Sequence, residues 1–419
     1  MTVKRSSFAR IVVFLASFVL LAQAGIAATI STRPLSSSRK PRRVVESRHA
    51  RRHMRHLARS RRVRSRTVTA LKRHHYYEHF YASSYASDIT DGDNTAGEVP
   101  VVRQAAIDAL GNMNGTVLAI EPTSGRILTM VNQKLALSSG AQPCSTIKLS
   151  VALAALSEGI ITKETEVRLG GRSHMNLTLA LAHSNNAYFE ALGRQLGFDK
   201  VSHYAHMYGL GERAGYHIAG EQLGTYPEEE ISSKLGGVGK MCSFGEGVSM
   251  TPLQLGALVT AIANGGTMYY LQHPRTADEV TNFQPIVKRH LDIAGLIPEI
   301  SDGMAGAVEY GTARRLLANF NEEEVLGKTG TCSHAGTRYG WFASYANTSF
   351  GRVVVVVFLE GGRPTFGPKA AEMAGRMYHN LYSHDFFLAR PIVPAPIVPA
   401  PIAPAPVVPA TVRETNTSD

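Results

Sequence analysis

Residues 143–156 read PCSTIKLSVALAAL, in which a proline and a short polar group lead into an apolar run with helical spacing. A proline just ahead of such a run favours a helix that begins near Pro143. Ser145 and Lys148 stand three positions apart in it, and residues at that spacing share one face of a helix. The amine of Lys148 is therefore expected within reach of the hydroxyl of Ser145.

A serine hydroxyl paired with a lysine amine is the core of one kind of covalent catalyst. Serine is a weak nucleophile until a neighbouring base takes its proton. Lysine can be that base only if its pKa falls, which burial and a nearby cation both achieve. At the start of a helix, the backbone N–H of Ser145 would also face a developing oxyanion. The pair alone is a weak signal, because Ser and Lys at this spacing are mostly a helix cap and a surface charge.

A second polar motif, Ser184-Asn185-Asn186, interrupts the apolar helical stretch ALAHSNNAYFEALG. The hydroxyl of Ser184 can relay a proton between Lys148 and a leaving group, and the amide of Asn186 can hold a substrate carbonyl. Ser and Asn are also the residues preferred at helix N-caps, so a purely structural role stays open.

A third motif, Lys328-Thr329-Gly330-Thr331, lies in the stretch VLGKTGTC. Lys328 offers a cation for a substrate carboxylate, and we assign Thr329 to the same substrate-binding group. Gly330 allows another backbone to approach closely, as the addition of a substrate strand requires. The N–H of Thr331 is a candidate second oxyanion donor beside that of Ser145. A turn at a strand edge is the structural alternative, and a phosphate loop is excluded because its earlier glycine is missing.

The order of these motifs, SxxK, SxN and KTG, is the signature of serine β-lactamases and penicillin-binding proteins. The first serine precedes the second by 39 residues, and 144 residues separate the second serine from Lys328. Over about residues 97–385 the chain resembles the transpeptidase domain of penicillin-binding proteins. Three further stretches carry the resemblance: EPTSGRILTMV, GEGVSMTPLQLGALVTAIANGG and GMAGAVEYGTARRL.

The resemblance implies both a fold and a chemistry. The fold is α+β, an antiparallel five-stranded sheet flanked by helices, with an all-helical subdomain inserted between the SxxK helix and the KTG strand. The reaction is acyl transfer on the D-Ala-D-Ala stem peptides of peptidoglycan, by a D,D-transpeptidase or carboxypeptidase that β-lactams acylate at Ser145. No cofactor and no metal is expected.

Two other functions remain open. A β-lactamase hydrolysing penicillins or carbapenems shares the acylation step but needs a carboxylate base that positions water. The ExxLN stretch that supplies this base in class A enzymes is absent, and Asn186 stands where class D enzymes usually carry an apolar residue. The third function is a β-lactam sensor or wall-binding scaffold without turnover. Four intact residues argue against it: Ser145, Lys148, Ser184 and Lys328.

The three cysteines, Cys144, Cys242 and Cys332, lack the spacing of metal ligands. Transpeptidases usually carry Gly directly before the nucleophile, where this chain has Cys144. The positions of Cys144 and Cys332 are similar to those of the cysteine pair in certain carbapenem-hydrolysing class A β-lactamases. This resemblance implies a Cys144–Cys332 disulfide, with two buried free thiols as the alternative. Cys242 has no evident partner.

The apolar runs of the chain also predict an α+β fold. Five strand-like segments are expected, at residues 116–120, 126–131, 325–331, 341–345 and 352–359. Residues 165–300 show mostly helical patterning with glycine-rich joints, and a last helix is expected at 368–382. Strands at both ends of this block indicate one sheet assembled from distant parts of the chain.

Both ends of the chain differ from the globular block, which we place at residues 97–388 as the transpeptidase domain. Residues 1–28 have the basic, apolar and small-residue order of an export signal or a short membrane anchor. This predicts a protein in the periplasm or on the outer face of the inner membrane. Residues 29–96 are expected to form a basic disordered linker, and residues 389–419 a Pro-rich disordered tail.

The basic charge is concentrated in the linker. Residues 33–73 hold 16 Lys or Arg against the single acid Glu46, a net +15, so the formal net charge of +11 comes from this segment and the rest of the chain is net negative. This segment can hold anionic membrane lipid or acidic wall polymer, or it can serve as a solvated tether. Nucleic acid is not an expected partner of an exported chain.

Overall fold

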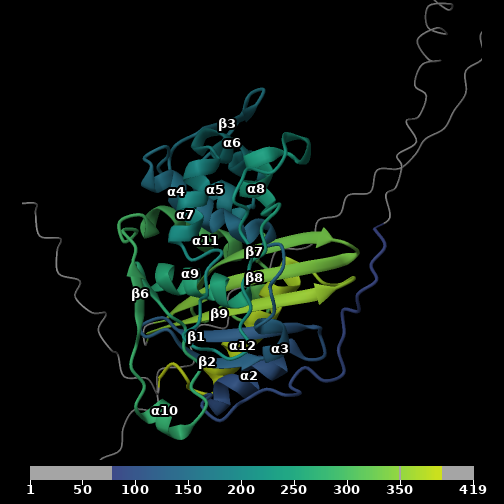
Figure 1. The fold of residues 1–419 in the computed structure, drawn as a ribbon, viewed down its shortest axis with the longest axis vertical. Coiled ribbons are helices and arrows are strands. Elements are labelled where there is room, and N and C mark those ends of the chain that lie inside the picture. The colour runs from purple at the N-terminus through teal and green to yellow at the C-terminus, as the bar shows by residue number, and fades with distance from the viewer. Residues whose placement is uncertain (1–77, 349–350, 389–419) are drawn as a thin grey trace, which may run out of the picture. The chain divides into compact units, whose positions relative to one another are not determined.

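The computed structural model describes residues 78–348 and 351–388 of the 419-residue chain. Its centre is one sheet of five antiparallel strands in the order β2-β1-β9-β8-β7 (Figure 1). The strands are β1 (Gly115–Glu121), β2 (Arg126–Val131), β7 (Glu324–His334), β8 (Thr337–Thr348) and β9 (Gly351–Gly361). The predicted α+β fold with a five-stranded antiparallel sheet is therefore confirmed, and strands from both ends of the folded block share it.

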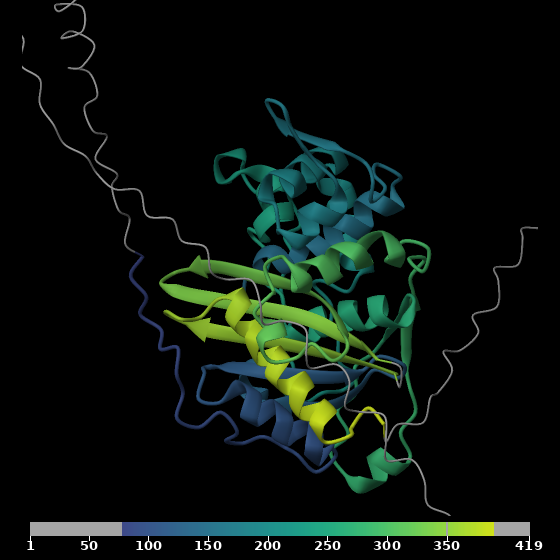
Figure 2. The same cartoon turned by 180° about the vertical axis from the view of Figure 1, so that it is seen from behind.

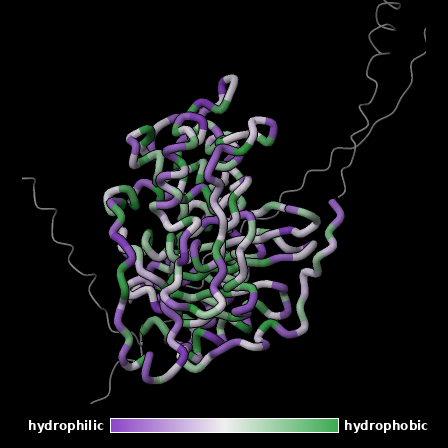
Figure 3. The backbone as a smooth tube through the Cα atoms, in the orientation of Figure 1, coloured by the Kyte–Doolittle hydropathy of each residue, from purple (hydrophilic) through white to green (hydrophobic). Residues whose placement is uncertain are grey.

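Strand β9 lies in the middle of the sheet and is buried on both of its faces. Successive side chains of a strand point to opposite faces. Alternate residues of β9 divide between two apolar cores: Val354, Val356 and Phe358 on one face, and Val353, Val355, Val357 and Leu359 on the other. An unbroken apolar run is expected where other elements cover both faces of a sheet. Figure 3 shows many apolar (green) stretches in the middle of the folded block, with hydrophilic (purple) stretches frequent in its outer loops.

Helices α2 (Pro100–Leu110) and α12 (Gly367–Ser383) cover one face of the sheet (Figure 2). Helix α9 (Pro252–Asn264) lies against the other face. A Cβ at its Gly256 would lie 2.7 Å from the Ile120 side chain of β1, so a glycine is needed for this close packing. Every residue of α9 from Pro252 to Ala263 is buried, as expected for a helix enclosed on all sides.

The chain between β2 and β7 forms a mainly helical insertion. Its longer helices are α4 (Lys148–Ser157), α5 (Leu177–Ala182), α6 (Asn186–Leu196), α7 (Phe198–Met207), α8 (Gly237–Phe244), α9 and α11 (Ile297–Glu309). Its shorter elements are α3 (Gln133–Ala136), α10 (Ala277–Thr281) and the 3-10 turns η1 (Cys144–Ile147), η2 (Ser233–Leu235) and η3 (Leu316–Ala318).

Two short ladders depart from the expectation of an all-helical insertion. Strand β3 (Val167–Gly170) pairs with β4 (Ser173–Met175), and β5 (Thr267–Tyr269) pairs with β6 (Val287–His290). Gly170 and Gly171 lie at the turn between β3 and β4, and their positive φ angles suit a tight hairpin turn.

The predicted signal or anchor at 1–28, the linker as far as residue 77 and the tail from residue 389 lie outside the described residues. In the ranges that the structure describes, we find no helix with the length and apolar character needed to span a membrane.

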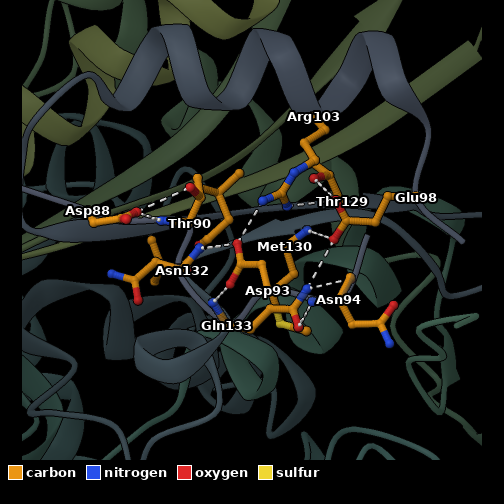
Figure 4. A network of polar contacts seen from close by, with 12 residues as sticks. Asp88, Thr90, Asp93, Asn94, Glu98, Arg103, Thr129, Met130, Asn132 and Gln133 are labelled. Carbon is orange, nitrogen blue, oxygen red and sulfur yellow. Dashed lines mark hydrogen bonds and ion pairs between the residues drawn. The ribbon is translucent and has the colours of Figure 1, made fainter. Parts of the chain in front are cut away.

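Buried charges tie the segment that precedes α2 to the sheet (Figure 4). Arg103 of α2 bridges two carboxylates, with Nη2 2.9 Å from Asp93 and Nη1 2.9 Å from Glu98. Asp93 also accepts hydrogen bonds from the backbone N–H groups of Asn132 and Gln133, at 3.0 and 2.7 Å. Both carboxylates are almost completely buried, so each needs these partners to remain charged.

Hydrogen bonds hold Glu98 in its charged form. Burial raises the pKa of this carboxyl, but hydrogen bonds from His273, Thr129 and the N–H of Met130 outweigh burial and bring the pKa below its ordinary value. These contacts differ from the expectation of a disordered linker that continues to residue 96, because residues 78–96 contact the folded block. Composition did not indicate this, since polar contacts anchor the segment and few apolar residues are buried in it.

Replacing Arg103 by Met should strongly destabilise the folded unit, because the buried carboxylates of Asp93 and Glu98 lose their common cation. Breaking a buried ion pair from one side lowers the free energy of unfolding by roughly 3–5 kcal/mol. Arg376→Met is the matched control: Arg376 pairs with Glu372 while its side chain is 45% exposed, so about 1 kcal/mol or less is expected. Urea unfolding measures both variants, and equal effects would contradict the assignment.

Candidate active site

Ser145 lies in the 3-10 turn η1, which leads directly into α4. Lys148 is the first residue of α4, and its Nζ lies 2.6 Å from Oγ of Ser145. Ser145 is 9% exposed and Lys148 is completely buried. The helix begins near Pro143, as predicted, but its first turn is a 3-10 turn. The two side chains still meet, because a 3-10 turn repeats every three residues.

The surroundings of Lys148 favour its neutral form. Burial lowers the pKa of the amine well below its ordinary value, and the nearby Lys328 lowers it further. Glu190 on α6 acts in the opposite direction. The rings of Phe189 and Phe244 lie 5.6 and 5.9 Å from Nζ, and no part of the Lys148 side chain is exposed. A lysine in this environment gives up its proton readily and can then act as a base.

The SxN motif lies between α5 and α6. Nζ of Lys148 donates to Oδ1 of Asn186 at 2.7 Å and lies 3.4 Å from Oγ of Ser184. The N-cap of α6 is Asn185, whose Oδ1 accepts from the N–H of Tyr188 at 2.9 Å. The helix-cap alternative therefore applies to Asn185, whereas Ser184 and Asn186 contact Lys148. The amide oxygen of Asn186 accepts the hydrogen bond from Lys148. The amide nitrogen is therefore the group that suits a substrate carbonyl.

Lys328 on β7 reaches the same serine from the side of the sheet. Its Nζ donates to Oγ of Ser184 at 2.8 Å and to the backbone oxygen of Thr329 at 3.0 Å. The side chain is completely buried, and burial lowers the pKa of Lys328 to about 7. Ser184 thus lies between two buried amines, one from α4 and one from β7.

Gly330 brings β7 against the turn that carries the first serine. A Cβ at this position would lie 2.9 Å from the carbonyl oxygen of Pro143 and 3.2 Å from Cβ of Trp341. We expected the glycine to admit a substrate strand, and the structure shows a close approach within the chain itself. One residue further, the hydroxyl of Thr331 accepts from the N–H of Gly367 at 2.8 Å.

Two residues of this region were not singled out from the sequence. Thr312, in the turn between α11 and η3, has its Oγ1 2.6 Å from Oγ1 of Thr329. Gln142 accepts from Nε1 of Trp341 at 3.0 Å and donates to Glu246 at 3.2 Å. A signal existed for Thr312, because it lies in GMAGAVEYGTARRL, one of the stretches that carried the family resemblance.

A disulfide joins Cys144 to Cys332, and their Cα atoms lie 5.5 Å apart. The φ angle of Cys144 is 52°, in the left-handed region that favours glycine, which agrees with the glycine usual at this position in transpeptidases. Cys242 is free and buried, and burial raises the pKa of its thiol to about 12. In the described part of the chain, no group of His, Cys, Asp and Glu side chains is arranged to hold a metal ion.

A five-stranded antiparallel sheet with a helical insertion, and a buried Ser–Lys–Ser–Lys cluster built from both, define the class of penicillin-interacting serine proteins. Within this class, the family model described as the penicillin binding protein transpeptidase domain matches residues 115–379. The chain belongs to that family.

The chain is similar to stage V sporulation protein D of Bacillus subtilis, with 30% identity over 228 residues that cover 48% of this chain and 34% of that protein. It is 24% identical to peptidoglycan D,D-transpeptidase MrdA of Acinetobacter baumannii over 347 residues, which cover 64% of this chain and 51% of MrdA. The chain thus spans about half or less of the length of these relatives. Among solved structures, Pseudomonas aeruginosa PBP2 shares the fold, with a TM-score of 0.59 and 21% identity over 70% of this chain and 75% of that one.

Thiol titration of the unreduced, denatured protein should find one reactive cysteine, Cys242, because Cys144 and Cys332 are bonded. After reduction the same titration should find three. Three thiols in unreduced protein isolated from an oxidising compartment would contradict the disulfide.

The stability of the folded unit should rise with pH because of Lys328. Its pKa is about 7 in the folded protein against 10.5 ordinarily, so between these values only the unfolded chain carries the proton. The free energy of unfolding then gains about 1.4 kcal/mol per pH unit from this residue. Lys328→Met removes the gain, so the stability of the variant relative to wild type should fall steadily from pH 7 to pH 10. A difference independent of pH would refute this.

Proposed function

We propose that the folded unit catalyses acyl transfer on D-Ala-D-Ala stem peptides of peptidoglycan, with Ser145 as nucleophile. The observation that carries the proposal is a run of short contacts, from Ser145 to Lys148 at 2.6 Å and from Ser184 to Lys328 at 2.8 Å. Membership of the transpeptidase family supports the reaction, as does the similarity to a protein named peptidoglycan D,D-transpeptidase.

In the acylation step, neutral Lys148 accepts the proton of Ser145 while Oγ attacks the carbonyl carbon of the penultimate D-Ala. A bond forms between oxygen and carbon, and the carbonyl oxygen takes the negative charge. The backbone N–H groups of Ser145 and Thr331 donate to this oxyanion. When the intermediate collapses, the C–N bond breaks and the departing D-Ala nitrogen receives the proton from Lys148 through Ser184.

We assign substrate binding to the remaining motif residues. Lys328 and Thr329 hold the terminal carboxylate, and a bound carboxylate favours the charged form of the lysine. The amide nitrogen of Asn186 donates to a carbonyl of the peptide, and Gly330 and Thr331 present their backbone to the extended substrate. β-Lactams acylate Ser145 in the same position and lack a departing amine.

The acyl-enzyme then transfers its acyl group to an amine of a second stem peptide. The amine nitrogen forms a bond to the carbonyl carbon, the ester bond to Ser145 breaks, and the proton of the amine returns the serine to its hydroxyl form through Lys148. With water in place of the amine, the same site would act as a carboxypeptidase. The relatives named as D,D-transpeptidases favour transfer over a β-lactamase or a sensor.

We place this reaction outside the inner membrane, where peptidoglycan lies. Residues 1–28 serve export or anchoring, and the basic residues 33–73 tether the unit near anionic lipid or wall polymer. For the proline-rich residues 389–419 we propose the role of a spacer.

Ser145→Ala should abolish covalent labelling of the full chain by a fluorescent penicillin, because it removes the oxygen that forms the acyl bond. Ser157→Ala, at the opposite end of α4, is the matched control and should be labelled as wild type. Labelling that persists in Ser145→Ala would rule out this serine as the nucleophile.

The acceptor is identified by incubating the full chain with a D-Ala-D-Ala pentapeptide, with and without an added amine, and weighing the products. Transfer predicts free D-Ala together with a peptide that carries the amine. Release of D-Ala with hydrolysed peptide alone would indicate a carboxypeptidase, and no release would indicate a sensor.

A further inference from the structure

Thr312 contacts both elements that bring polar motifs to the site. Its Oγ1 lies 2.6 Å from Oγ1 of Thr329, the residue that follows Lys328 in β7. Its backbone N–H donates to the carbonyl oxygen of Ala182, two residues before Ser184, at 3.2 Å. The turn after α11 therefore links the strand of the KTG motif to the loop of the SxN motif.

Close packing fixes the turn and the strand in this arrangement. A Cβ at Gly311 would lie 2.1 Å from the carbonyl oxygen of Ala182, and a Cβ at Gly367 would lie 3.0 Å from Cβ of Thr329. Thr329 is only 4% exposed and Thr312 is partly buried. Branching at Cβ restricts χ1 of threonine, so the two oxygens are held in place and only their hydrogens can turn.

The chemistry of two adjacent hydroxyls sets the direction of the hydrogen bond. Each hydroxyl has one hydrogen to donate, and at 2.6 Å one of the pair donates to the other. A carboxylate only accepts hydrogen bonds. For Thr329 to donate to a substrate carboxylate, Thr312 must donate to Thr329. The first hydrogen bond then polarises the second and strengthens it.

We propose that Thr312 is a positioning residue: its hydroxyl donates to Thr329 and so directs the Thr329 hydrogen toward the substrate carboxylate that Lys328 binds. The inference rests on the proposed function, since it concerns the ligand that acylates Ser145. Because Thr312 acts through another residue and away from the acyl carbon, it affects capture of the ligand and leaves the chemical step unchanged.

Thr312→Val tests the proposal, because valine keeps the branched shape and the backbone N–H but has no hydroxyl. With a penicillin that carries its free carboxylate, the second-order acylation rate constant of the full chain should fall about tenfold, the upper range for one net hydrogen bond. The first-order rate constant at saturating penicillin should change by less than about twofold. Thr312→Ser keeps the hydroxyl and should restore most of the second-order rate constant.

The methyl ester of the same penicillin separates positioning from packing. The ester has no charged carboxylate and offers Thr329 only a weaker, neutral carbonyl acceptor, so Thr312→Val should lose much less with the ester than with the acid. Equal losses with acid and ester, or no loss with the acid, would overturn the proposal. Thr281→Val removes a surface hydroxyl bonded to the carbonyl of Ala277 at 2.9 Å in α10, far from the site in Figure 1, and should match wild type.

A variant that does not fold and a wild-type chain that does not react have different consequences for the proposal. If Thr312→Val does not fold, as thermal unfolding would show, Thr312→Ala takes its place with the same expectations for acid and ester. If the wild-type chain itself is not acylated by the penicillin, the proposed function fails and this inference fails with it. If the wild-type chain is acylated and Thr312→Val keeps the full second-order rate constant, this inference fails while the proposed function stands.

Discussion

Two lysine amines are buried within reach of one hydroxyl, and the rest of the site depends on this arrangement. Lys148 comes from α4 and Lys328 from β7, and Oγ of Ser184 lies 3.4 and 2.8 Å from their Nζ atoms. Charged amines without water are poorly stabilised and repel one another, so the site favours one neutral amine. Their burial opposes folding, and the two apolar cores on the faces of the sheet supply the offsetting stability.

The approach of β7 to the turn η1 makes the convergence of the amines possible. Gly330 removes the side chain that would separate the two segments, and the Cys144–Cys332 disulfide joins them covalently. Trp341 of the neighbouring strand donates to the carbonyl of Gln142 just ahead of the turn. A left-handed conformation at a residue other than glycine costs on the order of 1 kcal/mol, and these contacts hold Cys144 in it.

Spacing in the sequence was enough to predict the parts of the site that are local. Ser145 and Lys148 meet because three residues make one turn, and the run before Leu359 is apolar at every position because β9 is buried on both faces. Residues that meet from distant segments of the chain show no comparable spacing pattern in the sequence. The hydroxyl of Thr312 and the carboxylate of Asp93 gain their roles only when the chain is folded, and nothing in the local sequence distinguishes Asn185 as the cap from Ser184 beside it.

The fate of the acyl-enzyme depends on which groups can activate water beside Ser145. Hydrolysis requires a base that orients a water molecule. Glu190 is the carboxylate whose charge acts on Lys148, and its oxygens lie 3.3 Å from Lys240 and 3.6 Å from Arg194. A carboxylate occupied by two cations is poorly placed to orient water as well. In the proposed transfer the attacking amine is a stronger nucleophile than water, and Lys148, neutral again once the first product has left, takes its proton. In the proposed reaction the same buried lysine would thus serve both halves of the transfer, and Glu190 is not free to act as the water-orienting base that hydrolysis needs.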